Sequence, residues 1–101
     1  MLLKDIRYYH QIALSNYLDR ETPGGNNYKM IATIYGFTNI DIDHFAKSKY
    51  YGKLPTEMLL CSMKMRYPEL TVESFRDKCR DIYRIDIVNF IDKNILPDNN
   101  I

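Results

Sequence analysis

Short segments with helical periodicity, separated by turn residues, account for most of this chain. In each segment apolar residues recur every three or four positions, which is typical of a helix that buries one face. Runs that alternate apolar and polar residues are no longer than these segments, so strand signals are weak. The expected helices cover residues 3–18, 28–35, 40–47, 55–67, 72–82 and 87–91. This pattern predicts an all-α fold, a six-helix antiparallel bundle.

The size of the chain fits that prediction. A length of 101 residues is one domain's worth, and a hydrophobic content of 46% is enough for a single core. We therefore expect one domain over residues 1–101. Its helical core should span about 3–94, followed by a frayed tail at 95–101.

Local signals define the first two helices. The expected inward stripe of the first consists of Ile6, Tyr9, Ala13 and Tyr17, with Leu14 and Leu18 beside it. The segment 22–25 has the composition of a turn, after which either Asn26 or Asn27 can cap the second helix. Gly36 suits a left-handed helix end, with Phe37 folding back behind it.

The later helices have their own start signals. Thr38 or Asn39 can cap the third helix, and Thr71 the fifth. Pro55 fits the first turn of the fourth. Its cap is not evident, because Leu54 has no side-chain acceptor and Thr56 would cap only a helix that starts later.

Charge and hydropathy limit the class of protein. The formal net charge is +1, with both signs interspersed. A nucleic-acid binder usually has a basic excess, whereas mixed charges suit contact with complementary patches on another protein. The sequence contains no apolar run near the length of a membrane span. Without a signal-peptide pattern, and with only two cysteines, the chain is expected to be cytoplasmic with reduced, mostly buried thiols.

The residue types that carry chemistry do not gather into a recognisable centre. His10 and His44 fall on different predicted helices, and Cys61 and Cys79 have no ligand spacing around them. Gly24-Gly25 is a turn and not a phosphate-binding loop. We therefore expect no enzyme, no metal site, no cofactor and no small-molecule substrate.

Three groups of residues follow one another in a fixed order. They are Tyr28, Ile31, Ala32 and Gly36-Phe37; then Pro55-Thr56 and Leu59-Leu60; then Thr71-Val72, Arg84, Asp86 and Ile87. From Leu14 to Ile91 the chain resembles a death domain. Within that superfamily it most resembles the domains of the myeloid differentiation primary-response adaptor, the interleukin-receptor-associated kinases, Tube and Pelle.

The chain also departs from that family. Tyr28 and Met63 stand where the family usually has Trp, and the loop before Pro55 is longer. Tyr83 precedes the Arg, where the family often has Gly.

The resemblance implies an adaptor that binds other death-domain proteins, such as an adaptor, kinase or receptor, in innate-immune or apoptotic signalling. Three asymmetric contact types would build a helical assembly, including possible self-assembly. No nucleic acid and no membrane partner is expected. The alternative is a small helical nucleic-acid-binding domain that contacts phosphate through the fifth helix or the loop 47–53.

The family's contact near the sixth helix falls on Arg84 and Asp86. Its candidate opposite face consists of Lys64, Arg66 and Glu69. On this interpretation Arg84→Glu would abolish assembly and leave the fold intact. The local alternative is that Asp86 caps the sixth helix while Arg84 pairs nearby.

A second candidate contact combines Asp41, Asp43 and Lys47 of the third helix with Arg20 and Glu21 of the first loop. The alternative for these five is helix capping and solvation.

A third candidate is the pair Tyr50 and Tyr51, flanked by Lys49 and Lys53. Tyrosine is enriched among interface anchors. The alternative is that one ring packs into the bundle and the other is incidental.

Overall fold

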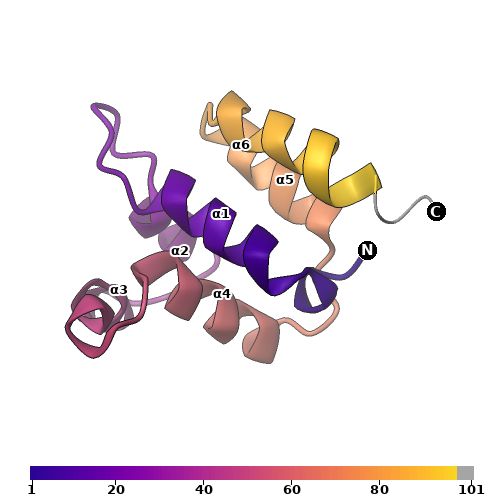
Figure 1. Cartoon of the computed structure of the whole chain (residues 1–101). Coiled ribbons are helices and arrows are strands. Elements are labelled where there is room, and N and C mark those ends of the chain that lie inside the picture. The colour runs from indigo at the N-terminus through magenta and orange to yellow at the C-terminus, as the bar shows by residue number, and fades with distance from the viewer. Residues whose placement is uncertain (98–101) are drawn as a thin grey trace.

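The computed structural model describes residues 1–97 and contains six α-helices (Figure 1). They are α1 (Tyr8–Leu18), α2 (Tyr28–Ile34), α3 (Asn39–Lys47), α4 (Pro55–Arg66), α5 (Val72–Asp81) and α6 (Ile85–Phe90). Two 3₁₀ turns, η1 (Leu3–Asp5) and η2 (Ser48–Tyr51), and a π-helical turn, η3 (Ile91–Ile95), complete the elements. Within residues 1–97 the only β-type pairing is one isolated bridge between Leu2 and Thr71. The all-α prediction with six helices is confirmed.

The helices surround one apolar core. In Figure 1, α1 runs between α4 on one side and the α5–α6 pair on the other, and α3 lies beside the beginning of α4. Helix α4 packs against α1, α2 and α3. The core contains the following fully buried side chains from five of the six helices: Leu14, Leu18, Ile31, Leu59, Leu60, Met63, Phe75 and Ile87.

The first helix differs from the prediction in both length and face. The expected helix 3–18 is interrupted, because Ile6 and Arg7 have extended backbone between η1 and α1. The expected stripe is confirmed at Ile6, which is buried, and wrong at Tyr9, which is 58% exposed. The buried face of α1 contains Leu14 and Leu18, as predicted, together with the polar residues His10, Gln11 and Ser15. The Ser15 hydroxyl donates to the Gln11 carbonyl at 3.0 Å, so this buried polar group is hydrogen-bonded.

The predicted caps of α2 and α3 are confirmed. Asn27 is the N-cap of α2, and its side-chain oxygen accepts the Lys29 N–H at 3.1 Å. Gly36 has a φ of 84°, and the Phe37 N–H reaches back to the Ala32 carbonyl at 3.0 Å. Thr38 caps α3 and forms a capping box with Asp41.

The missing cap of α4 comes from a distant residue. Asp19, which follows α1, accepts the Thr56 N–H at 2.8 Å and the Thr56 hydroxyl at 2.5 Å. The Glu57 carboxylate accepts the Leu54 N–H at 3.2 Å. The start of α4 is therefore satisfied by a carboxylate 37 positions earlier in the chain.

The C-terminal end of the fold extends further than predicted. Residue 95 was expected to open the frayed tail, but Ile95 ends η3 and is 1% exposed. The rest of the expected tail from residue 98 onward lies outside the described residues.

Candidate interaction surfaces

Arg84 does not lie on an open surface. Its side chain is buried, with 6% of the residue exposed. The guanidinium donates to the Asn26 carbonyl at 2.7 Å and to the Tyr17 carbonyl at 2.9 Å. It therefore ties the end of α1 and the following loop to the start of α6. This burial argues against the expectation that Arg84→Glu leaves the fold intact, because the substitution would leave two carbonyl oxygens facing a buried carboxylate.

The local alternative is confirmed in one of its two parts: Arg84 pairs with Asp86, but Asp86 does not cap α6, whose N-cap residue is Arg84 and which has no side-chain cap. Asp86 accepts from the Arg84 Nε at 3.0 Å and from a terminal guanidinium nitrogen at 2.9 Å. These hydrogen bonds lower the pKa of the Asp86 carboxyl below its ordinary value. Asp86 itself remains exposed.

Tyr83, which was not among the candidate residues, occupies the turn between α5 and α6. It has a φ of 64°, and it is the only non-glycine residue of 1–97 with positive φ. Its side chain is 85% exposed. The sequence held one signal of this backbone: Tyr83 stands where the death domains that the chain resembles often have Gly, and the left-handed region favours glycine.

Both rings of the Tyr50–Tyr51 pair point into solvent. They are 76% and 84% exposed, so the alternative in which one ring packs into the bundle is wrong. The two residues belong to η2, which ends at Gly52 with a φ of 78°. The Lys49 ammonium lies 5.7 Å from the centre of the Tyr50 ring. This turn presents an aromatic and basic tip.

The structure keeps Glu21 beside α3 but places Arg20 of the second candidate contact on another surface. Asp41 belongs to the α3 capping box, and Asp43 pairs with Lys47 at 2.9 Å on the same helix. Glu21 lines a hollow of about 390 Å³ beside Asn27 and Ala46. Arg20 lines a different hollow of about 400 Å³ between α1 and Phe90. The two loop residues therefore face different surfaces, and the capping alternative describes Asp41.

The end of α4 carries the other candidates. Lys64 is half-buried and donates to the side-chain oxygen of Gln11. Glu69 is exposed in the turn after the helix. Arg66 is exposed, and its guanidinium carbon lies 4.1 Å from the centre of the Phe37 ring. Of the three, Arg66 is the one that borders a depression of the surface.

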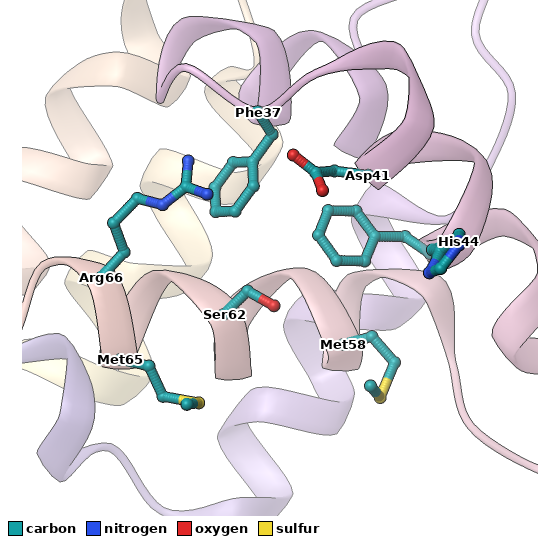
Figure 2. Close-up of a pocket in the computed structure, with 8 residues that line it drawn as sticks. Phe37, Asp41, His44, Met58, Ser62, Met65 and Arg66 are labelled. Carbon is teal, nitrogen blue, oxygen red and sulfur yellow. The ribbon is translucent and has the colours of Figure 1, made fainter.

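This depression, the α3–α4 groove, has a volume of about 600 Å³ (Figure 2). Its lining residues are Phe37, Asp41, His44, Phe45, Met58, Ser62, Met65 and Arg66. The Phe37 and Phe45 rings meet edge to face with centres 5.5 Å apart. Figure 2 shows Arg66 beside Phe37 near one end of the groove and His44 near the other. Sequence reasoning missed the groove, although Met58, Ser62 and Met65 recur at helical spacing.

Within residues 1–97 there is no group of three His, Cys, Asp or Glu side chains placed to bind a metal ion. In the same part of the chain no helix combines the length and the apolarity needed to cross a bilayer. Cys61 is exposed, contrary to the expectation of mostly buried thiols. Cys79 is buried, which raises the pKa of its thiol to about 12.

No protein-family model, curated protein or solved structure matches this chain.

Proposed function

We propose that this chain is a death-domain-type adaptor module that acts in the cytoplasm. It assembles with further copies of itself or with other death-domain proteins, and it carries out no catalysis. The single observation that supports this proposal best is the exposure of aromatic rings in two separate turns, Tyr50–Tyr51 in η2 and Tyr83 between α5 and α6. Exposed tyrosines anchor protein interfaces, because they add large apolar area at low entropic cost.

The positions of the two turns favour an asymmetric contact. In Figure 1, α3 lies on the opposite side of α1 from the α5–α6 turn, and η2 follows α3 directly in the chain. A contact that joins two different surfaces is heterologous, and it builds an open stack if the rotation does not close. Such a stack raises the effective concentration of attached signalling domains.

The test is light scattering after size-exclusion chromatography, over about a hundredfold range of concentration at two salt concentrations. We expect the mass to grow beyond that of a dimer, and the growth to weaken with salt. Tyr51→Ser and Tyr83→Gly should each reduce this growth while the helical circular dichroism stays unchanged. Unchanged growth in both variants would refute the role of the aromatic turns.

A monomeric wild type at every concentration would refute self-assembly. The remaining form of the proposal, recruitment to another death-domain protein, would then be tested by co-purification with candidate death domains. Loss of capture in the Tyr51→Ser and Tyr83→Gly variants is the expected result.

The nucleic-acid alternative has weaker support. In the loop 47–53, Lys47 is paired with Asp43 at 2.9 Å, and Lys49 lies against the Tyr50 ring. Duplex DNA titrated at low salt tests it, because phosphate contacts give affinity that falls steeply with salt. Binding with such a slope would favour this alternative over the adaptor.

A further inference from the structure

Helix α4 is apolar on two sides. Leu59, Leu60 and Met63 face the core and are fully buried. A second apolar stripe on the outer side consists of Met58, Cys61 and Met65, at the spacing i, i+3 and i+7, with the polar Ser62 on the same face. In a soluble domain a helix that is apolar on both sides is normally covered on both. Here the outer stripe borders the α3–α4 groove, and Met65 is 85% exposed.

The rim of the groove has a positive group in a fixed position. The Arg66 guanidinium stacks on Phe37 and makes no hydrogen bond or ion pair with residues 1–97. A stacked guanidinium keeps its N–H donors in the plane of the group, where they can reach a carboxylate. Asp41 is the acidic residue on the rim, and its carboxylate accepts the Thr38 N–H at 3.0 Å at the start of α3.

These charges select the chemistry of the partner. The Asp41 carboxylate accepts the Thr38 N–H within the α3 capping box, and this hydrogen bond lowers the pKa of Asp41. Arg66 acts on Asp41 electrostatically, but it forms no hydrogen bond or ion pair with residues 1–97, so its N–H donors leave that end of the rim suited to an acidic group. The floor of phenyl and methionine side chains suits aliphatic groups, and methionine adapts to different shapes.

The openness of the groove selects the size of the partner. Its volume lies within the range of small-molecule sites. Such sites, however, bury most of their ligand, and Met65 at the edge is almost fully in solvent. An amphipathic helix fits better, because its polar side remains in water when its apolar side occupies a groove.

We propose that the α3–α4 groove binds an acidic amphipathic helix of a partner protein. Two or three aliphatic side chains of that helix lie over Phe37, Phe45 and Met58, and a carboxylate pairs with Arg66. This partner need not be a death domain, so the site extends the chain's interactions beyond the proposed assembly.

The test uses a synthetic helical peptide with leucines at i, i+4 and i+7 and glutamates on the flanks. The matched peptide has lysines in place of the glutamates. The full chain is labelled with ¹³C at the methionine methyl groups, and the five methionines are followed by NMR. We expect the acidic peptide to shift the signals of Met58 and Met65, with a dissociation constant of about 10–100 μM. Met30 on α2 does not line the groove and should not shift.

Two substitutions that change the net charge by the same amount distinguish binding in the groove from a general effect of charge on peptide affinity. Arg66→Glu should weaken the acidic peptide by about tenfold or more and favour the lysine peptide. Lys93→Glu on η3, away from the groove, should leave both affinities unchanged. Ser62→Trp, which fills the groove, should abolish the shifts, and its circular dichroism reports whether the fold is retained.

Four results would overturn the proposal. The first is no methionine shift up to about 1 mM peptide, and the second is equal loss of affinity in Arg66→Glu and Lys93→Glu. The third is tighter binding of decanoate than of the acidic peptide, which would assign the groove to a small amphipathic anion. The fourth is a shift of Met58 and Met65 with protein concentration alone, which would assign it to a second copy of this chain.

Discussion

Tyr83→Gly should make the protein more stable while it removes an exposed aromatic side chain. An L-residue in the left-handed region costs about 1–2 kcal/mol relative to right-handed backbone, and Tyr83 has a φ of 64°. Glycine avoids this cost, but its greater freedom in the unfolded chain offsets roughly 0.5–1 kcal/mol of the gain. Because the side chain is 85% exposed, its loss removes little packing. The net expectation is a gain of about 0.5–1 kcal/mol in the free energy of unfolding.

The turn itself should remain unchanged in the variant. The Tyr83 N–H donates to the Arg80 carbonyl and the Arg84 N–H to the Cys79 carbonyl, each at 2.9 Å. These main-chain hydrogen bonds form the left-handed helix end that glycine favours. The melting temperature should rise by roughly 3–6 °C, measured by thermal circular dichroism.

Tyr83→Ala is the matched control. It removes the ring but keeps a side chain on left-handed backbone, so its stability should stay within about 0.5 kcal/mol of wild type. If the glycine variant were no more stable than the alanine variant, the backbone of this turn would not be strained, and the reasoning would be refuted. If Tyr83→Gly is more stable than wild type, any weaker self-assembly of this variant cannot be attributed to unfolding.

Three further predictions concern buried or paired polar groups. Arg84→Met should lower the free energy of unfolding by about 2–4 kcal/mol in urea denaturation, because the Asn26 and Tyr17 carbonyls lose their donor; Arg80→Met, an exposed change on α5, should stay within about 0.5 kcal/mol. Tyr35→Phe should stabilise the fold by about 1 kcal/mol in the same assay, because the Tyr35 hydroxyl is buried without a partner among residues 1–97. Asp86→Asn should be less stable than wild type near neutral pH. Because the folded pKa of Asp86 is lowered, its contribution is present above the ordinary aspartate pKa and is lost as pH falls below about 4; a stability difference that stays constant from pH 7 to about 3 would contradict this.

The sequence predicts the features of this fold that depend on neighbouring residues. The caps at Asn27, Thr38 and Thr71 and the left-handed Gly36 each require only three or four consecutive positions, and the structure has all four. Periodicity also located the helices, because each buries a stripe at helical spacing.

The features that depend on distant partners could not be predicted. The buried face of α1 contains Gln11, whose side chain is satisfied by Lys64 on α4. Arg84 looked like a surface charge, because nothing nearby in the sequence shows that the Tyr17 and Asn26 carbonyls surround it. The α3–α4 groove forms only because Phe37 and α3 lie beside α4, and the sequence does not show this contact. The sequence shows only the outer apolar stripe of α4.

The hydrogen bonds from Thr56 to the Asp19 carboxylate close the intervening chain into a loop that contains α2 and α3. Loss of this bond would free the first turn of α4 and one end of that loop at the same time. The amides of α2 and α3 should therefore exchange with solvent as one cooperative unit, through an opening with a lower free energy than global unfolding. Helices α5 and α6 lie outside the loop, so their amides need not exchange with it. The carboxylate of Asp19 is thus expected to set how easily α2 and α3 open, while the hydrogen bonds of Asn26 with Ile82 and Arg84 hold the beginning of this loop to the α5–α6 turn.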